Sequence, residues 1–355
     1  MNHKRNLLVA DEAGFARKIA FSLVLFVSAF VLSSCGGDST DPADGNWYQI
    51  ESGYNGVARY GAVSFMIGNN VYSGLGIDKE GDRLSDFYIY NAANGYWDSV
   101  KVASFPGVPR TGAVAFSAGG FGYVGLGYNN DTEGDYLADF YKYDPTKNTW
   151  TKIKDFPSGR QFAVAFVVNN VAYVGTGIND NYLQDFYKYD AVNNEWLPIR
   201  TFGGSKRYGA TAFTINGKGY VGLGINNAVP QKNIYEYDPE QNTWTKKDQL
   251  TDEGDFSARS QAGVFILNNK AYIFMGTSGS AQLGDIWEYE PTADVWNQKQ
   301  KITDDCGSGR SFPLAFSYDN KGYIMTGASS ASSGSALDDM WQFTPDVVKV
   351  DCADE

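Results

Sequence analysis

Histidine is almost missing from this sequence: His3 is the single copy, and residues 4–355 contain none. Without an imidazole the chain cannot form a Ser-His-Asp triad or a Cys-His pair, and the common zinc and copper sites lose their usual ligand. Cysteine is also scarce, with 3 residues in 355. We therefore predict no metal, no other cofactor and no thiol catalysis.

Clusters of basic residues are lacking as well. The formal net charge is -12, and residues 1–34 hold four basic and two acidic side chains, so a chain without them carries about -14. A chain this acidic is repelled by nucleic acid and by anionic lipid surfaces. The composition therefore argues against nucleic-acid partners and against any membrane contact other than a covalent anchor.

Long apolar runs are limited to residues 19–32, which follow two basic residues. The run is short for a membrane span and is followed by small residues, as in a secretory signal. Residues 32–35, Leu-Ser-Ser-Cys, resemble the bacterial lipobox. That resemblance implies a signal peptide over residues 1–34 and lipidation of Cys35, and an ordinary signal with a chance cysteine is the alternative.

The segment behind the predicted anchor, residues 35–46, is rich in Gly, Ser, Thr, Pro and Asp and predicts a flexible tether. Gly36 stands where an Asp would signal retention at the inner membrane, so we expect attachment to the outer membrane, facing the periplasm or the cell surface. In such an oxidising compartment Cys306 and Cys352 are candidates for a disulfide. Two free thiols are the alternative, because the sequence does not give their separation.

The rest of the chain is repetitive, and six segments can be aligned on an arginine. Successive arginines are 51, 50, 47, 52 and 51 residues apart, close to the period of about 50 residues found in one class of propeller blade. The aligned residues are Arg59, Arg110, Arg160, Arg207, Arg259 and Arg310.

Each unit carries the signals of four short antiparallel strands. The first strand ends at a two-residue turn typical of a type I′ hairpin, and the second contains a Tyr followed by a Gly. The third opens with Asp in five units and with Asn233 in the other, and the fourth opens with Trp. The turns are Gly68-Asn69, Gly119-Gly120, Asn169-Asn170, Asn216-Gly217, Asn268-Asn269 and Asp319-Asn320, and the tryptophans are Trp97, Trp150, Trp196, Trp244 and Trp296.

The sixth unit lacks this Trp, and the missing strand is found at the other end of the chain. Residues 47–50, Trp-Tyr-Gln-Ile, match residues 150–153, Trp-Thr-Lys-Ile. We therefore expect the N-terminal segment to supply the outer strand of the last blade and to close the ring, which hides sheet edges. Residues 347–350 could compete for that position or lie beside it.

In their spacing these Arg, Gly, Tyr and Trp positions resemble the kelch family. The resemblance covers residues 47–346 and implies an all-β fold, a six-bladed kelch-like propeller with four antiparallel strands per blade, followed by a tail at 347–355. Most units carry Gly-x-Gly, as in residues 125–127, where typical kelch repeats have a Gly-Gly doublet. This departure indicates a divergent bacterial branch.

The arginines are the feature with the most functional promise. In a four-stranded meander the loop between blades and the loop between strands two and three emerge on one face, so all six should approach the central opening there. Some kelch domains use Arg at the corresponding position to grip carboxylates. The alternative is that each Arg pairs with the Asp that opens strand three. The residue after the Arg varies between units, and the predicted ligand-binding set is Arg59, Arg110, Arg160, Arg207, Arg259, Arg310, Tyr60, Gln161 and Tyr208.

Acidic turns recur on the same predicted face. The pattern Asp-x-Glu-Gly-Asp occurs at residues 78–82 and 131–135, and residues 251–255 are similar. Oxygen ligands at alternating positions suit Ca²⁺, but an EF-hand loop is longer and ends in a bidentate Glu. We therefore expect solvated acidic turns, which together with the arginines give a mouth of mixed charge.

Two functions from different classes fit these features. The first is a non-catalytic platform in the cell envelope that engages a protein or glycan partner through the Arg-bearing face. The alternative is an enzyme acting on an acidic sugar, because the sequence resembles bacterial kelch proteins that interconvert sialic acid anomers without histidine. Its acid or base would be a pocket Glu or Asp, which the sequence does not single out. A glycosidase would need two acids at a set separation, and none can be placed.

Overall fold

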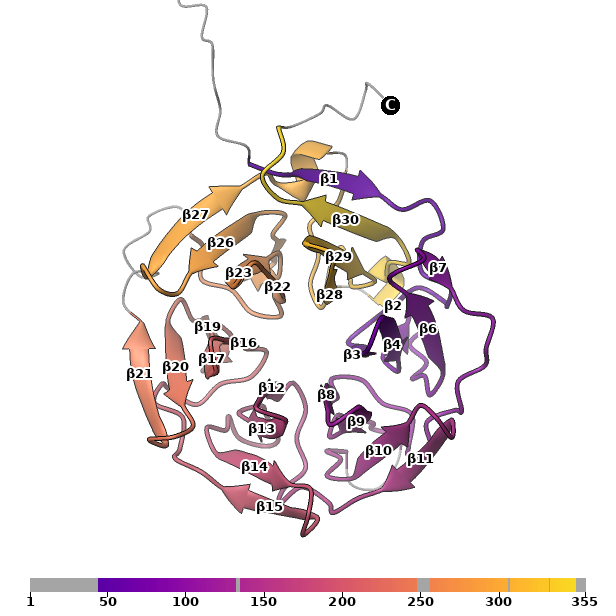
Figure 1. Ribbon diagram of the computed structural model, residues 1–355, viewed down its shortest axis with the longest axis vertical. Coiled ribbons are helices and arrows are strands. Elements are labelled where there is room, and N and C mark those ends of the chain that lie inside the picture. Colours follow the sequence, from indigo (N-terminus) through magenta and orange to yellow (C-terminus); the bar gives the residue numbers. More distant parts are fainter. Residues whose placement is uncertain (1–43, 132–134, 248–255, 306, 332, 349–355) are drawn as a thin grey trace, which may run out of the picture. The chain divides into compact units, whose positions relative to one another are not determined.

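The computed structural model describes residues 44–348 apart from 132–134, 248–255, 306 and 332. The strands form six four-stranded antiparallel sheets, which Figure 1 shows arranged around a central axis. This is the predicted all-β propeller with six blades. No helix in the described part of the chain is long and apolar enough to cross a membrane.

In blades 1 to 5 the strands follow the chain from the axis outward (Figure 1), as the four-strand pattern predicts. Blades 1 to 3 consist of β3 (Val63–Ile67), β4 (Asn70–Gly74), β6 (Phe87–Asn91) and β7 (Tyr96–Trp97); β8 (Val114–Ala118), β9 (Phe121–Gly125), β10 (Phe140–Asp144) and β11 (Thr149–Lys152); β12 (Val164–Val168), β13 (Val171–Gly175), β14 (Phe186–Asp190) and β15 (Glu195–Pro198). Blades 4 and 5 consist of β16 (Thr211–Ile215), β17 (Lys218–Gly222), β20 (Ile234–Asp238) and β21 (Thr243–Lys247); β22 (Gly263–Leu267), β23 (Lys270–Phe274), β26 (Ile286–Glu290) and β27 (Val295–Lys299).

Blade 6 joins the two ends of the described chain. It consists of β28 (Leu314–Tyr318), β29 (Lys321–Met325), β30 (Met340–Thr344) and, as its outer strand, β1 (Asn46–Gln49). The register pairs Trp47 with Phe343, and the Trp47 indole donates to the carbonyl of Gln300 at 2.9 Å. Trp150 makes the same bond in blade 2, to the carbonyl of Ala103 at 2.9 Å. The predicted closure by the N-terminal strand is therefore confirmed.

The two ends of the propeller differ slightly from the predicted bounds of 47 and 346. Its first strand begins at Asn46 and not at residue 47, and the rest of the predicted leader and tether up to residue 43 lies outside the described residues. At the other end Val347 lies beside β1, where its carbonyl accepts a bond from Gly45 N at 3.1 Å. Cys35, Cys306 and Cys352 also lie outside the described residues, so lipidation and the disulfide stay predictions.

Aromatic side chains fill the space between blades. The Phe of the first strand stacks on the Tyr of the second in all six blades, for example Phe116 on Tyr123 with ring centroids 4.9 Å apart. The strand-four Trp closes the outer side, as where Trp196 packs on Phe140 at 4.9 Å. Such rings bury a large apolar area each, so the sheets are held by side-chain packing across every blade junction.

The hairpins between strands one and two agree with the predicted turn type in five blades. Both central residues there have a positive φ, as the type I′ turn requires. The first blade differs, because only Gly68 has a positive φ and Asn69 does not.

Among the described residues, the connections contain three short strand pairs and two short 3-10 helices. Their positions matter because they build the face that carries the loops between blades. The pairs are β2 (Arg59–Tyr60) with β5 (Ile77–Asp78), β18 (Ile225–Asn226) with β19 (Val229–Pro230), and β24 (Thr277–Ser278) with β25 (Ala281–Gln282); the helices are η2 (Ile302–Asp305) and η3 (Ser333–Ser335).

Candidate functional site

The six repeat arginines are wholly buried, which departs from the predicted ligand-gripping ring. Arg259 is typical: its Nε donates to Ser257 O at 3.0 Å, its Nη1 to Met275 O at 3.2 Å, and its two terminal nitrogens to the Asp285 carboxylate at 2.7 Å each. The same arrangement holds in five blades, through Asp86, Asp139, Asp185, Asp285 and Asp339. The side chains of Arg59, Arg110, Arg160, Arg207, Arg259 and Arg310 are all 0% exposed.

This burial corrects the expectation that the repeat arginines bind a ligand at the opening. The guanidinium groups are closed off from the opening, so a ligand there contacts none of the six. Five of them pair with the Asp that opens strand three, which was the alternative prediction. Removing Arg110 or Arg207 must therefore disturb folding, because a charged or polar partner is left buried without its bond.

Blade 4 is the exception among the six. Asn233 replaces the Asp, and its Oδ1 accepts a bond from Arg207 Nη1 at 2.9 Å, while Arg207 Nη2 donates to Ser205 Oγ at 3.1 Å. Burial without a carboxylate lowers the pKa of Arg207 to about 10. A buried cation therefore persists where its usual counter-ion is missing.

The surface above these arginines is built from six three-residue rows, which we call the mouth strips. In each strip the residue after the Arg pairs with the residue after the repeat Gly, and that residue pairs with one from the returning loop. Antiparallel partners point to the same side of a sheet, so the three side chains of a strip share one face. The strips of blades 1 to 6 are Tyr60, Ile77, Arg83; Thr111, Tyr128, Tyr136; Gln161, Ile178, Tyr182; Tyr208, Ile225, Pro230; Ser260, Thr277, Gln282; and Ser311, Ala328, Ala336.

The mouth strips are not alike. Tyr60, Gln161 and Tyr208, the predicted binding candidates that follow the arginines, occupy the first positions in blades 1, 3 and 4. Large side chains fill the strips of blades 1 to 4, while those of blades 5 and 6 are mostly small and polar. Arg83 and Tyr182 were missed by the sequence reasoning, which aligned only the residues next to the repeat Arg.

A second feature, the inner ring, surrounds the axis two residues after each Arg. Its backbone is left-handed in all six blades, with φ between 53° and 62°. Its members are Gly61, Gly112, Phe162, Gly209, Gln261 and Phe312. Left-handed backbone costs a residue other than glycine about 1–2 kcal/mol. The exceptions to Gly could have been found in the sequence as departures from Arg-x-Gly.

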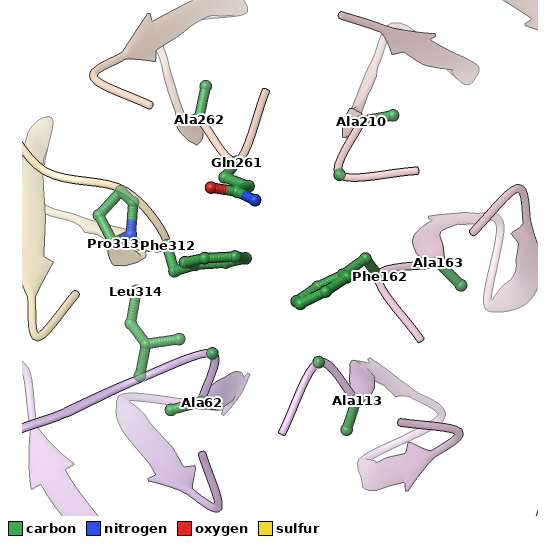
Figure 2. Close-up of a pocket in the computed structure, with 13 residues that line it drawn as sticks. Ala62, Ala113, Phe162, Ala163, Ala210, Gln261, Ala262, Phe312, Pro313 and Leu314 are labelled. Carbon is green, nitrogen blue, oxygen red and sulfur yellow. The ribbon is translucent and has the colours of Figure 1, made fainter. Parts of the chain in front are cut away.

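Figure 2 shows Phe162 and Phe312 extended toward each other across the opening, with Gln261 beside them. Their ring centroids are 5.1 Å apart, and they come from blades 3 and 6, on opposite sides of the propeller. The space around them on the axis measures about 160 Å³. The two rings therefore lie across the centre of the mouth.

A cavity of about 290 Å³ lies off the axis, over the small side chains of blades 5 and 6. Phe312 and Gln261 of the inner ring line it, and Tyr60 and Ile225 bound it from blades 1 and 4. Hydroxyl and amide groups complete the lining, at Thr277, Ser280, Gln282, Ser311 and Ser330.

Tyr60 is the titratable residue among the described residues that line the cavity. Burial raises the pKa of Tyr60, and the nearby Arg83 opposes that rise. Its phenol is therefore protonated at neutral pH and can donate a proton or a hydrogen bond into the cavity.

Arg83 is the one cation among the eighteen residues of the mouth strips. Its Nη1 donates to Asp131 Oδ2 at 3.2 Å, and its guanidinium carbon lies 5.6 Å from the centroid of the Tyr128 ring. The Arg83 side chain is 12% exposed and that of Asp131 is 71% exposed. Arg83 therefore makes one ion pair with a largely exposed carboxylate, whereas a repeat arginine such as Arg259 makes four hydrogen bonds to buried or part-buried partners.

Of the three acidic loops, one is described in full. The Asp78 carboxylate accepts bonds from its own turn, from the backbone N–H groups of Glu80 and Asp82 at 3.0 and 2.9 Å. No cluster of three metal-binding side chains occurs among the residues the structure describes. Residues 132–134 of the second loop and all of 251–255 lie outside them.

These features define the class of protein, a six-bladed β-propeller with a loop-bearing mouth. The family follows from the sequence, because the profile of the KLHDC2/KLHL20/DRC7 Kelch-repeats domain matches residues 39–224, just over half of the chain. The chain therefore belongs to this kelch-repeat family, and the resemblance inferred from the repeats is confirmed.

Comparison with known proteins adds two similarities. Proteins named N-acetylneuraminate epimerase, from Shigella sonnei strain Ss046 and Escherichia coli O157:H7, are 39% and 40% identical over 83 residues, which cover 22% of this chain. The match spans 23% of those relatives, about a quarter of their length. The solved "Structure of YjhT" has a TM-score of 0.68 at 18% identity, covering 82% of this chain and 96% of that one, and supports the fold.

These similarities correct the first functional hypothesis. A non-catalytic binding platform was expected, but the matched relatives carry the name of an enzyme. The platform hypothesis rested on the propeller fold and on the Arg-bearing face, and a fold alone does not decide between binding and catalysis. The alternative, an enzyme that needs no histidine, is the hypothesis that these names favour.

Proposed function

We propose that this protein is an enzyme acting on an acidic sugar, of the sialic acid mutarotase or epimerase kind, with its substrate site at the propeller mouth. The identity to proteins named N-acetylneuraminate epimerase supports the substrate class. The observation that carries the proposal is the cavity over blades 5 and 6, which is lined by neutral hydrogen-bonding side chains. Tyr60 in this lining lies near enough to Arg83, the one cation of the mouth strips, for the charge of Arg83 to affect its pKa.

The cavity matches such a substrate in size and chemistry. Its volume of about 290 Å³ is close to the lower limit of small-ligand pockets, about 300 Å³. An acidic monosaccharide carries several hydroxyl groups and a single carboxylate. The hydroxyls can exchange hydrogen bonds with Gln261, Thr277 and Gln282, and an apolar face of the sugar can lie on Phe312.

Arg83 is the residue that would bind the carboxylate. The six repeat arginines are buried in ion pairs or in amide and hydroxyl bonds, so they cannot serve. The Arg83 ion pair with Asp131 is weak because Asp131 is largely exposed, and exposed pairs contribute little. A substrate carboxylate would therefore replace Asp131 and gain a charge-assisted, bidentate bond.

The reaction needs a proton donor at the ring oxygen and removal of the proton from the anomeric hydroxyl. As the ring C–O bond breaks, the ring oxygen takes a proton and the anomeric hydroxyl becomes the carbonyl of the open chain; closure on the other face gives the other anomer. Tyr60 is the proton donor that the described lining offers, and water takes up the other proton. The predicted Glu or Asp is absent from the described residues of this wall.

Anomer exchange of N-acetylneuraminate, followed by saturation-transfer NMR, tests the proposal. The wild-type protein should accelerate exchange above the buffer rate. Arg83→Gln should lower kcat/KM about 10- to 100-fold, mainly through KM, because a charge-assisted bond is worth about 1.5–3 kcal/mol. Asp131→Asn should lower KM, since it removes the competing carboxylate, and Arg200→Gln on an exposed arginine is the matched control.

The two substitutions at the Arg83 pair separate recognition from structure. If the pair only stabilises the loop, both variants change the kinetics in the same direction. Wild-type protein that leaves the exchange rate at its buffer value overturns the proposed function.

We further propose that the enzyme works in the cell envelope, anchored by lipid at Cys35 to the outer membrane. The lipobox-like residues 32–35 support this, and the acidic charge of the remaining chain argues against direct contact with anionic lipid. Metabolic labelling with a fatty-acid analogue should mark the wild-type protein and not Cys35→Ser. Labelling of both would overturn the anchor.

A further inference from the structure

We propose that Phe312, supported by Phe162, is a stacking platform for a pyranose ring at the floor of the mouth cavity. The proposal rests on the proposed function for the acidic sugar as substrate, while the platform itself requires only a sugar ring. It assigns binding to Phe312, which lines the cavity, and positioning to Phe162, which lies against Phe312 from the opposite blade.

The backbone of the inner ring does not need these side chains. Gly112 N donates to Gly61 O at 2.9 Å, and Phe162 N donates to Gly112 O at 2.8 Å. The same link therefore forms whether the donor residue is Gly or Phe. Since the left-handed conformation is free of strain only for Gly, the fold would be served at least as well by Gly at all six positions.

The hydrophobic core does not need them either. Phe162 and Phe312 are half-buried, and neither belongs to the clusters that pack the blades in the described chain. Their ring contacts are with each other and with residues of the mouth strips: Phe312 with Tyr60 at 6.2 Å and Phe162 with Tyr208 at 6.0 Å. The strained backbone at these two positions therefore places aromatic side chains at the mouth. Strained residues of this kind are frequent at ligand sites.

The surroundings select a sugar as the ligand. Phe312 offers an apolar face, and residues with hydrogen-bonding side chains line the cavity around it, among them Gln261, Thr277 and Gln282. A pyranose ring presents C–H bonds on its faces and hydroxyl groups around its edge, so it can stack on the ring while its edge meets the polar wall. A flat apolar ligand would leave those polar groups unsatisfied.

The test compares three substitutions at Phe312. Phe312→Gly removes both ring and strain, Phe312→Leu keeps the strained backbone without the ring, and Phe312→Tyr keeps an aromatic face. Binding of N-acetylneuraminate and of a neutral methyl galactoside is measured by saturation-transfer difference NMR, with Tm from calorimetry. Phe116→Gly, in the blade core, is the stability control.

We expect Phe312→Gly and Phe312→Leu to raise the Kd for N-acetylneuraminate at least about 10-fold, and Phe312→Tyr to stay within about threefold, as for a stacking contact. Tm should change by less than about 3 °C in Phe312→Gly, because strain relief offsets the lost ring contact. Phe116→Gly should lower Tm far more. If Phe162 positions the Phe312 ring, Phe162→Gly should weaken binding, and Phe162→Tyr should bind like the wild-type protein.

The outcomes separate the platform from the reaction. Unchanged binding in Phe312→Gly overturns the platform, as does a Tm loss like that of Phe116→Gly, and so does wild-type protein that binds neither sugar. Wild-type protein that binds a sugar through Phe312 without accelerating anomer exchange leaves the platform standing and removes the proposed reaction.

Discussion

Two layers of this propeller lie only two residues apart in every blade, yet they behave differently. The layer of repeat arginines is nearly the same six times over, buried and bonded to the same backbone positions. The inner ring and the mouth strips above it change from blade to blade. The difference teaches that repetition here marks what holds the blades together, while departures from the repeat mark where a ligand can be recognised.

Removing a repeat arginine should have the largest effect on the stability of the fold. Arg110→Ala should lower the free energy of unfolding by about 3–5 kcal/mol, because Asp139 is left without its partner in a largely buried site. Chemical denaturation measures this loss. As a control, Arg200→Ala on an exposed side chain should change the free energy of unfolding by no more than about 0.5 kcal/mol. Equal losses in the two variants would show that the repeat arginines do not stabilise the fold.

Exchanging Asp and Asn as partners of the repeat arginines tests how much the carboxylate contributes to stability. Asp139→Asn gives blade 2 the chemistry of blade 4, and should cost about 1–3 kcal/mol because a charge-assisted pair is lost. Asn233→Asp gives blade 4 the usual pair and should stabilise the fold by about 1 kcal/mol, since the buried Arg207 gains a counter-ion. Denaturation curves of the two variants should shift in opposite directions; a shared direction would show that each blade has adapted to its own partner.

The smallest effect is on the acid stability of the arginine layer. Burial raises the pKa of Asp285 and Asp339, but the hydrogen bond and charge of the partner Arg outweigh it, so both pKa values end below the ordinary 3.8. Carboxylates with a lowered folded pKa stabilise the fold above their unfolded pKa, and that contribution is lost as the pH falls through the folded value. We expect stability to decline below about pH 4, measured by denaturation across pH.

Asn233→Asp adds one more such carboxylate, so its stability gain should vanish in acid. A gain that persists after the carboxylates are protonated would mean that the added Asp acts through shape and not through charge.

Much of the fold could be predicted from residues that recur. The six arginines set the number of blades, the Gly and Asn turns set the hairpins, and Trp47 identified the strand that closes the ring. The candidate site was harder. Arg83 has no counterpart in the other repeats, and Phe162 and Phe312 replace the Gly that follows the repeat Arg by two residues, a position that was not compared when only the residue next to the Arg was aligned.

The sequence by itself determined the propeller, because five blades are built from strands that follow one another in the chain, with tight turns and aromatic residues at recurring positions, and the sixth blade lacks only the strand that residues 47–50 match. Only the tertiary structure decided that the repeat arginines are buried and that Arg83, Tyr60 and Phe312 gather at one mouth. The reason is physical. Whether a charged group bonds to a buried partner or remains available to a ligand depends on its distance from residues in other loops and blades. Those distances are set only once the ring has closed.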